Sequence, residues 1–508
     1  MERAELRRTA RGAIVAASWA NLVMLPEWEH LLQPEVSASM WLRPSANACW
    51  AAVIVVVWFG VVGALVGWLC PKPRSEPGRS ISQLALVGAF CFCLDSVRVV
   101  NDFNFLRAEV WVRGGWHIGL AVVLATTALV AVLRWRAVLA RASMRLLLIL
   151  APFALVTTGR AASIAAFTDF AVLEPHAPPA TFSADTTGQR VVILVFDELD
   201  YGLAFSRRPA DLRLESMDRL RREGFFATDV EPASRAATRV AIPSLLTGRV
   251  VDSVKNVSQG SALARFRGQT EAEDLANTET LFDDAAAAGA PSEIAGALLP
   301  YCRWRLASFT RRCTWLPLSG RSGVLEGPLP LGRSIARQLR AFGGPVGSRD
   351  AWIRSLREMT DVAVAASVNP ANRLVFVHLV VPHAPFVWNA STGSFTRFQF
   401  RQSGYFGNLG LADHILGQFL TTIEGSPLRD RTTIVVTSDH GFRGAGVAGV
   451  APDRHVPFAV LFPSRTPTLW EEPLYTVPLR PLSIALLRGE LRSGDDLRQW
   501  LQHRTRSE

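Results

Sequence analysis

The sequence predicts two parts: an α-helical transmembrane domain, then an α/β domain with a mostly parallel β-sheet flanked by helices. Residues 12–165 are dominated by Ala, Val, Leu and Trp, with charges gathered between apolar blocks. Residues 190–490 instead contain short apolar runs that alternate with helical patterns. Nearly continuous Val, Leu and Ile runs are typical of parallel strands that helices cover on both faces.

We divide the 508-residue chain accordingly. Residues 1–170 form the predicted transmembrane domain, with about five helices of membrane-spanning length. Residues 171–189 are rich in Pro, Ala, Ser and Thr and form a predicted linker. Residues 190–490 form the predicted α/β domain, and residues 491–508 form a C-terminal tail.

Five apolar stretches approach the length of about 20 residues that crosses a bilayer. They cover residues 13–30, 46–69, 81–99, 116–133 and 146–167. Charged residues such as Glu27, Asp95 and Arg160 weaken the first, third and fifth. A weak stretch could instead be re-entrant, and residues 1–20 could be a signal peptide. The signal peptide is disfavoured because no small-residue cleavage site precedes Glu27 and further spans follow.

Basic residues indicate how the spans are oriented. They cluster before the first stretch, between the second and third, and between the fourth and fifth. The clusters consist of Arg3, Arg7, Arg8, Arg11, Lys72, Arg74, Arg79, Arg134, Arg136, Arg141 and Arg145. By the positive-inside rule, we expect the N-terminus to be cytoplasmic. With five spans, everything after Phe167 then lies on the extracytoplasmic side of the membrane. The net charge is +10, and nearly all of the basic residues are Arg. These residues do not form a basic stripe interleaved with aromatic residues, so we expect no nucleic-acid partner.

The predicted elements of the α/β domain follow from the apolar periodicity. The predicted strands cover residues 191–196, 225–230, 292–297, 373–381, 432–437 and 457–462. The predicted helices cover residues 214–222, 236–246, 278–288, 351–367 and 409–423. Pro243 is expected to break the second of these helices. Residues 320–347 are rich in Gly and Pro and are expected to be irregular.

Cys302 and Cys313 are the only cysteines in the α/β domain. A cysteine pair in an exported domain can form a disulfide, and we predict one here. The alternative is two unpaired thiols, and the spacing fits no zinc motif. The other four cysteines fall in or at the end of apolar stretches, where packing explains them.

Side chains that can hold a metal follow two of the predicted buried strands. Asp197 and Glu198 come after one strand, and Asp439 and His440 come after another. Because the carboxyl ends of parallel strands meet at the same edge of a sheet, we expect these residues to come together. Carboxylates and imidazoles bind divalent cations. The sequence therefore predicts a metal site at this edge.

Two further segments carry possible chemistry. Thr238 lies at the start of a predicted helix, five residues before Pro243 and ahead of a Leu-Leu-Thr-Gly sequence. A hydroxyl at a helix N-terminus lies in positive potential and can act as a nucleophile, although capping is the commonest role of such a threonine. The other segment is His378-Leu-Val-Val-Pro-His383-Ala-Pro, and His455-Val-Pro follows later in the chain.

Together these segments resemble the alkaline phosphatase and sulfatase superfamily. The closest resemblance is to its membrane-anchored branch, which includes phosphoethanolamine transferases and lipoteichoic acid synthases, and it covers residues 190–465. It implies an alkaline phosphatase-like fold and a divalent cation, Zn²⁺ or Mn²⁺, with Mg²⁺ or Ca²⁺ as further candidates. The implied metal ligands are Asp197, Thr238, Asp439 and His440, and Thr238 is also the implied nucleophile.

Other residues correspond to this family less firmly. Glu198 is either a further metal ligand or the partner of a neighbouring arginine. His383 and His455 correspond to histidines that complete a second metal site or contact phosphate, so both are candidate catalytic proton carriers. His378 lies within a strand run, which favours a buried structural role. His414 has no such context and is interpreted as incidental.

The resemblance also implies a function. Residue 238 is not Cys and no Pro-Ser-Arg follows it, so the formylglycine of sulfatases cannot form and a phospho-threonine is expected instead. The implied enzyme transfers a phospho-substituent from a phospholipid donor to a cell-envelope glycan. It would be a multi-pass protein of the bacterial cytoplasmic (inner) membrane, with its catalytic domain on the extracytoplasmic side. The alternatives are a membrane-anchored phosphate or sulfate ester hydrolase and a non-catalytic envelope scaffold; oligomeric state is left open.

Overall fold

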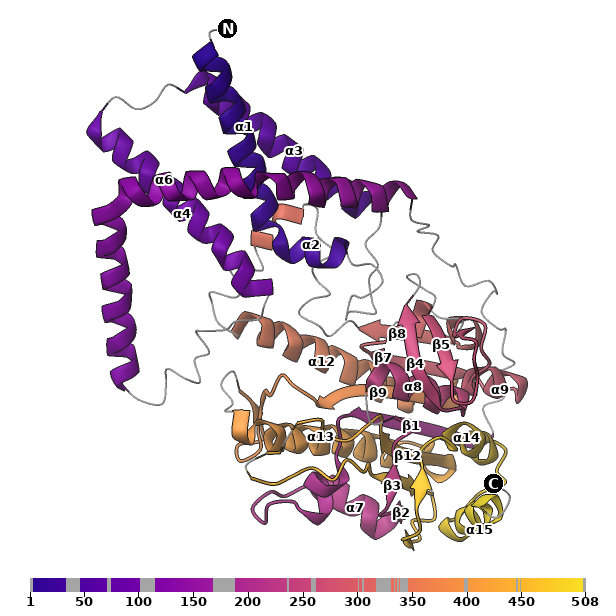
Figure 1. The fold of residues 1–508 in the computed structure, drawn as a ribbon. Helices are drawn as coiled ribbons and strands as arrows, with labels where there is room; N and C mark the ends of the chain where they lie inside the picture. The colour runs from indigo at the N-terminus through magenta and orange to yellow at the C-terminus, as the bar shows by residue number, and fades with distance from the viewer. Residues whose placement is uncertain are drawn as a thin grey trace. The chain divides into compact units, whose positions relative to one another are not determined.

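A computed structural model gives the fold of most of the chain (Figure 1). It describes residues 3–32, 46–70, 75–100, 115–167, 188–234, 237–256, 262–299, 301–303, 306–316, 330–332, 334–335, 338, 346–396, 401–444, 446–447 and 449–505. The chain forms two compact units. One comprises Met1–Ala171 with Gly320–Ser348, and the other comprises Val172–Ser319 with Arg349–Glu508.

The first unit is helical. Its elements are α1 (Arg3–Val23), α2 (Leu25–Leu31), α3 (Ala46–Leu69), α4 (Glu76–Val100) and α6 (Gly115–Phe167). Glycines allow α1 and α3 to pack closely, since a Cβ at Gly12 would lie 2.2 Å from the Gly63 carbonyl oxygen. Such close packing through small residues is common between membrane helices.

Three described helical stretches are long and apolar enough to cross a membrane, whereas the sequence predicted five spans. They are Ala46–Leu69, Glu76–Val97 and Val122–Phe167. The fourth and fifth predicted spans both lie in α6, which consists of two helices that meet at a kink at Trp135, so the two predicted spans lie on opposite sides of this kink. The first predicted span is divided between α1 and α2 near Met24 and is not among the three.

Part of the Gly/Pro-rich segment 320–347 is helical rather than irregular. Its described residues include Leu331 and Ile335, which pack against the apolar core of the helical unit. Gln338 donates hydrogen bonds from Nε2 to the Val23 carbonyl oxygen at 3.3 Å and to Ser96 Oγ at 2.5 Å. This segment therefore belongs to the helical unit although it lies within the α/β part of the sequence.

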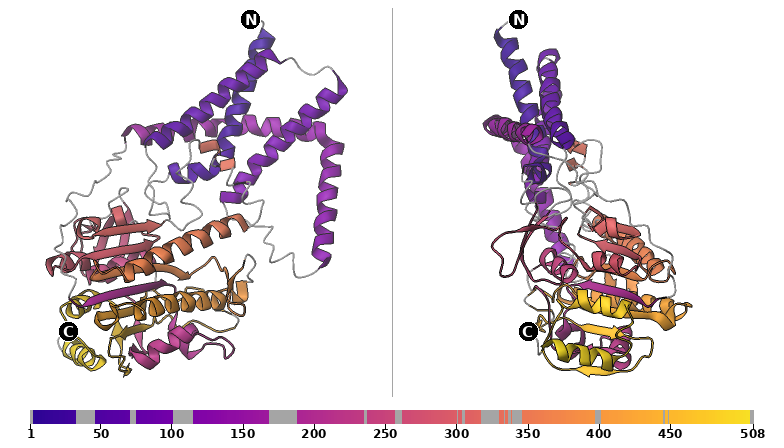
Figure 2. Two further views of the ribbon diagram at one scale, coloured as in Figure 1. Left: turned by 180° about the vertical axis from the view of Figure 1, so that it is seen from behind. Right: turned by 90° about the vertical axis from the view of Figure 1, so that its right-hand side faces the viewer.

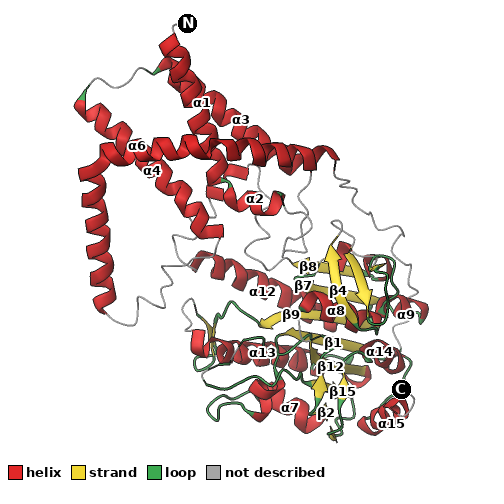
Figure 3. Ribbon diagram, viewed as in Figure 1, coloured by secondary structure: helices red, strands yellow, loops and turns green. Residues whose placement is uncertain are grey.

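The second unit contains an eight-stranded sheet in the order β14-β2-β13-β12-β1-β9-β7-β8 (Figure 3). The strands are β1 (Arg190–Asp197), β2 (Phe225–Ala227), β7 (Ser292–Ala297), β8 (Arg312–Leu316), β9 (Leu374–Pro382), β12 (Thr432–Ser438), β13 (Phe458–Leu461) and β14 (Thr468–Trp470). All neighbouring pairs are parallel except those of β13, which runs antiparallel to β12 and β2. The mostly parallel sheet confirms the prediction.

Helices cover both faces of this sheet (Figure 2). They are α7 (Glu215–Glu223), α8 (Thr238–Thr247), α9 (Leu281–Ala287), α10 (Leu306–Phe309), α12 (Val346–Ser367), α13 (Arg401–Glu424), α14 (Leu479–Leu487) and α15 (Gly494–Thr505). On one face, Val192, Leu194 and Phe196 share a core with residues of α7, α12 and α13. On the other face, Phe376 packs edge-on against Phe282 of α9, with ring centroids 6.0 Å apart.

The smaller elements were not predicted individually. They are the pairs β10 (Trp388–Asn389) with β11 (Ser394–Phe395) and β3 (Val230–Glu231) with β15 (Leu474–Tyr475), and the sheet of β4 (Val251–Asn256), β5 (Ala262–Phe266) and β6 (Glu273–Asp274). The segment expected to be a C-terminal tail contains α15, which buries Leu497 and Leu501. The predicted disulfide between Cys302 and Cys313 is present.

Helix α8 continues through Pro243 to Thr247, although the sequence predicted a break at the proline. A proline removes one backbone hydrogen bond, here the bond to the carbonyl of Arg239. The next turn gains a replacement, because Ser244 Oγ donates to the Val240 carbonyl oxygen at 2.8 Å and accepts from the Val251 amide at 2.9 Å. The helix is therefore stabilised by a hydrogen bond to a residue outside it, in addition to its own backbone hydrogen bonds.

Candidate active site

The ends of β1, β9 and β12 converge at one edge of the sheet. Phe196 is in register with Ser438, and Val195 is in register with His378. Asp197 and Asp439 thus leave neighbouring strands side by side, and the Asp439 amide donates to the Phe196 carbonyl oxygen at 3.1 Å. Parallel register at a strand edge is what positions both carboxylates, as the sequence predicted.

A cluster of potential metal ligands forms at this edge. Ligand atoms of Asp197, His378 and Asp439 all lie within 4.8 Å of one another. His440 Nε2 adds to the cluster, at 3.8 Å from Asp197 Oδ1 and 3.4 Å from Asp439 Oδ2. All four residues are fully buried. We call these four residues together with Thr238 the strand-end cluster.

Thr238 is the first residue of α8, and its Oγ1 lies 3.4 Å from His440 Nε2. The N-cap position belongs to Ala237, which has extended backbone angles, and no side chain caps this helix. The hydroxyl of Thr238 therefore faces the strand-end cluster rather than the end of its own helix. The positive end of the helix dipole lies at the same point and favours an anionic oxygen there.

His378 is the residue whose proximity to the metal ligands the sequence interpretation missed. It is buried, as expected, but its Nε2 has no hydrogen-bond partner among the described residues. Its Nδ1 lies 3.0 Å from the Ala297 carbonyl oxygen and 2.8 Å from the Tyr301 hydroxyl. Burial lowers the pKa of His378 to about 4, so the ring is neutral at ordinary pH. The sequence did contain a signal for this proximity, because His378 lies in a predicted buried strand that ends at the same sheet edge as Asp197.

The cluster fits a cation because it contains acceptors that face one another. Both carboxylate oxygens of Asp197 and Oδ2 of Asp439 are buried without hydrogen-bond partners among the described residues. Burial, together with the nearby Asp439 charge, holds the pKa of Asp197 well above its usual range. His440 Nδ1 lies 2.9 Å from the Gly441 carbonyl oxygen, which places a hydrogen there and leaves a lone pair on Nε2. Metal-binding histidines commonly have this second hydrogen bond.

Glu198 contacts an arginine at the border of the cluster. Arg443 donates from Nε to Glu198 Oε1 at 2.8 Å, and its NH2 lies 3.3 Å from His383 Nε2. Glu198 has a left-handed backbone with φ of 65°, and its amide donates to Asp439 Oδ1 at 3.2 Å. Strained backbone of this kind occurs at functional sites when surrounding contacts hold it. The arginine-partner interpretation of Glu198 matches this geometry.

His383 and His455 lie on loops beside the cluster. His383 donates from its amide to the Asp197 carbonyl oxygen at 3.2 Å, and its ring is near Arg443. The His455 ring forms an ion-pair contact with Asp229, with 3.1 Å between Nε2 and Oδ1. The loop before His455 packs against Gly441, where a Cβ would lie 2.7 Å from the Arg454 Cα. A cavity of about 130 Å³ lies here, lined by Gly441, Phe442, Arg443 and Arg454.

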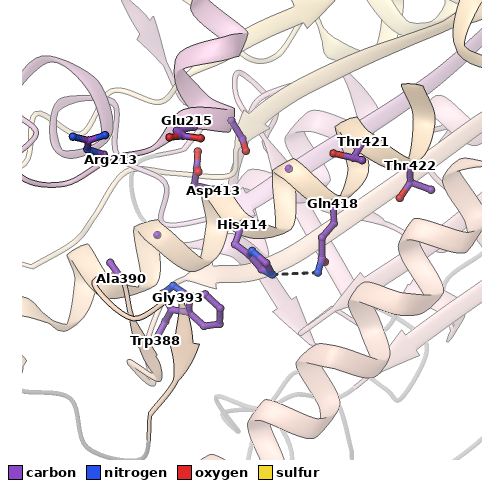
Figure 4. A pocket seen from close by; sticks show the side chains of 13 residues that line it. Arg213, Glu215, Trp388, Ala390, Gly393, Asp413, His414, Gln418, Thr421 and Thr422 are labelled. Carbon is purple, nitrogen blue, oxygen red and sulfur yellow. Dashed lines mark hydrogen bonds between the residues drawn. The ribbon is translucent and has the colours of Figure 1, made fainter. Parts of the chain in front are cut away.

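A larger groove of about 650 Å³ lies along α13, away from these residues (Figure 4). Trp388 and His414 stack there with ring centroids 5.2 Å apart. Asp413 in this groove accepts a hydrogen bond from the Met217 amide at 2.7 Å, which caps α7 from a neighbouring helix. Burial raises the pKa of Asp413 to about 6. No member of the strand-end cluster lines the groove, so the groove does not define the chemistry.

The chain is similar to one protein family and to several solved structures. Residues 349–479 match the family model for sulfatases. The lipoteichoic acid synthase LtaP from Listeria monocytogenes is similar in structure, with 13% identity, coverage of 62% of this chain and 76% of that chain, and a TM-score of 0.38. A phosphonate monoester hydrolase of Agrobacterium radiobacter has 14% identity, coverage of 59% and 77%, and a TM-score of 0.39. No curated protein matches the sequence.

Part of the chain resembles the sulfatase and alkaline phosphatase superfamily: residues 349–479 match the family model for sulfatases and lie in the unit that contains the mostly parallel sheet. This matched segment contributes β9, β12 and β13 and therefore includes His378, His383, Asp439 and His440. Enzymes of this superfamily depend on metal ions, in agreement with the unpartnered acceptors.

Proposed function

We propose that this protein is a membrane-anchored, metal-dependent enzyme that transfers a phospho-substituent from a phospholipid donor to a cell-envelope glycan. The transfer proceeds through a phospho-threonine at Thr238. The observation that carries the proposal is the position of the Thr238 hydroxyl, 3.4 Å from His440 Nε2 and at the N-terminus of α8. A hydroxyl beside unpartnered buried carboxylates, with the positive end of a helix dipole behind it, is suited to nucleophilic attack.

The residues that would hold the metal are those of the strand-end cluster. Mixed carboxylate and imidazole donors, with one hydroxyl, suit Zn²⁺ or Mn²⁺ better than the all-oxygen preference of Ca²⁺ and Mg²⁺. When bound, the cation would supply positive charge that lowers the pKa of the Thr238 hydroxyl and stabilises charge on the phosphoryl oxygens.

The first half of the reaction loads Thr238. Its hydroxyl loses the proton to water, the oxygen forms a bond to phosphorus, and the bond from phosphorus to the lipid alcohol breaks. A histidine gives a proton to the departing lipid oxygen. The ring of His383 is half-buried near Arg443, and the ring of His455 pairs with Asp229, so either can carry this proton.

The second half releases the group to an acceptor. A sugar hydroxyl of the acceptor loses its proton to the same histidine, and its oxygen forms a bond to phosphorus. The bond from phosphorus to Thr238 then breaks, and the Thr238 oxygen takes a proton from water, which restores the hydroxyl. If water replaces the sugar, the same steps amount to ester hydrolysis, which is the alternative activity.

Phosphoryl rather than sulfuryl chemistry is supported by the residue at position 238, because a threonine cannot become formylglycine. The cavity beside Gly441 adds to this, since Arg443 and Arg454 line it. Two guanidinium groups can donate hydrogen bonds to the oxygens of a phosphate ester. Arg443 also bonds to Glu198, so its head is already oriented beside the cluster.

A phospholipid donor requires the catalytic unit and the lipid to be on the same membrane side, and we propose the extracytoplasmic side. Three or five crossings both put the two ends of the chain on opposite sides. A reporter that is active only outside the cytoplasm should therefore give signal when fused after Glu508. The same reporter fused after Arg79 should be silent if there are five crossings, because this connection is then cytoplasmic, and should give signal if there are three. The reverse pattern would rule out this orientation.

The transfer itself is testable with the purified full-length protein in phospholipid micelles. After incubation with Zn²⁺ or Mn²⁺, peptide mass spectrometry should find a phospho-substituent on Thr238. Adding a glycan acceptor should remove this adduct and produce a modified glycan, whereas the hydrolase alternative gives a product released into water at the same rate with or without glycan. Absence of any adduct on Thr238 during measurable turnover would refute the phospho-threonine.

A further inference from the structure

Tyr301 lies beside the strand-end cluster without belonging to it. It is fully buried, and its hydroxyl is 2.8 Å from Nδ1 of His378. The two rings meet edge to face, with centroids 6.1 Å apart and an interplanar angle of 74°. Tyr301 therefore contacts His378 on the side of the ring opposite to the nitrogen that faces Asp197 and Asp439.

Two local features determine where the Tyr301 ring lies. Gly296 on β7 is in register with His378, and a Cβ at Gly296 would lie 2.3 and 2.4 Å from ring atoms of Tyr301. Only glycine leaves this space, which explains a glycine inside a central strand. The disulfide joins Cys302, next to Tyr301, to Cys313 on β8, and Cys313 is in register with Ile294 of β7.

The hydrogen bonds of the His378 ring decide which nitrogen can bind a cation. The Ala297 carbonyl oxygen, 3.0 Å from Nδ1, can only accept, so the hydrogen of the neutral ring lies on Nδ1. This leaves a lone pair on Nε2, the atom that has no hydrogen-bond partner among the described residues. The Tyr301 oxygen accepts from the same Nδ1 hydrogen and limits rotation of the ring.

We propose that Tyr301, seated on Gly296 and tethered through the Cys302–Cys313 disulfide, is a positioning residue that holds His378 so that its Nε2 serves as an additional metal ligand. The proposal rests on the metal site of the proposed function but not on its substrate. Partners of this kind orient metal-binding histidines, and their loss typically weakens metal affinity by about 10- to 100-fold.

The test uses the full-length protein with Tyr301→Phe, which keeps the ring and removes the hydroxyl. Chelator competition should show Zn²⁺ and Mn²⁺ affinities lower by about 10- to 100-fold. The visible spectrum of the Co²⁺-loaded protein, which reports ligand number and geometry, should shift in the same direction for Tyr301→Phe and His378→Gln. Gly296→Ala should also weaken binding, because the added Cβ displaces the Tyr301 ring.

Thr360→Val is the matched control, because it removes a buried hydroxyl whose hydrogen bond among the described residues goes to the Leu356 carbonyl within α12. It should lower thermal stability about as much as Tyr301→Phe and leave metal affinity and the Co²⁺ spectrum unchanged. If the wild type binds metal and Tyr301→Phe binds it equally well with an unchanged spectrum, the positioning role is wrong and the metal site stands. If the wild type binds none of these ions, the metal site and the positioning role both fail.

Discussion

Replacing Thr238 with alanine should reduce turnover of a phospholipid donor by on the order of 10³-fold or more, because the attacking oxygen is lost. The fold should remain intact. The N-cap residue of α8 is Ala237, and the Thr238 hydroxyl makes no capping hydrogen bond that the substitution could remove. Thr238→Ser should retain measurable turnover because it keeps the hydroxyl. Release of labelled lipid alcohol by the full-length protein, with metal content measured in parallel, checks all three expectations.

A control in the same helix separates chemistry from helix stability. Thr247 is buried near the end of α8, and its Oγ1 donates to the Pro243 carbonyl oxygen at 2.7 Å. Thr247→Ala should lower the melting temperature, since a lost buried hydrogen bond costs about 0.5–1.5 kcal/mol, but turnover per folded molecule should be unchanged. Near-wild-type turnover by Thr238→Ala would disprove the phospho-threonine and leave the sulfatase-family match of residues 349–479 unaffected.

Replacing Asp197 with asparagine should abolish metal binding and yet stabilise the metal-free protein. The carboxylate of Asp197 is fully buried, neither oxygen has a hydrogen-bond partner among the described residues, and Asp439 lies nearby. An unpaired buried charge is costly, and the asparagine amide removes it. Elemental analysis should find no bound Zn²⁺ or Mn²⁺ in the variant, and added metal should no longer raise its melting temperature, whereas it raises that of the wild type.

The pH dependence of the metal-free protein has a definite sign. Burial and the Asp439 charge raise the folded-state pKa of Asp197 above its unfolded value. The associated stability is therefore fully present below the unfolded pKa and is lost as pH rises through the folded pKa. In the presence of a chelator, wild-type stability should fall from about pH 4 toward neutral pH, and Asp197→Asn should remove much of this decline.

Asp200 provides a matched control, because it is also buried but has partners. Its Oδ1 accepts from the Leu203 amide at 3.0 Å and its Oδ2 from the Arg454 amide at 3.0 Å. Asp200→Asn places an amide N–H against one of these donors and should destabilise the protein while metal remains bound. An Asp197→Asn protein that keeps its metal, or that melts below the wild type in chelator, would contradict the proposed role.

The sequence by itself determined the parts of the site that depend on short-range chain geometry. A continuous apolar run predicts a buried strand, and the residue after the run must emerge at its end, so Asp197, Asp439 and His440 could be assigned to one edge. The mostly parallel sheet followed from strands alternating with helices. The disulfide followed from two cysteines in one domain that the sequence predicts to be exported.

Only the tertiary structure decided the role of the residues that meet across strands. His378 has the apolar neighbours of a core residue, and nothing in its own strand reveals that it faces Asp197 and Asp439. Its contact with Tyr301 depends on the register between β7 and β9, which puts Gly296 beside it. Register is set by pairing between distant segments, so no local pattern encodes it.

The same reason explains the helices that differ from the predictions. The break expected at Pro243 is avoided because Ser244 bonds to Val251 outside the helix. The segment expected as a tail forms α15 because it can bury Leu497 and Leu501 against the α/β unit. Local propensity is a weak preference that long-range packing and hydrogen bonding override. The sequence therefore determined which candidate residues lie at the strand ends, and the tertiary structure decided which neighbours surround them.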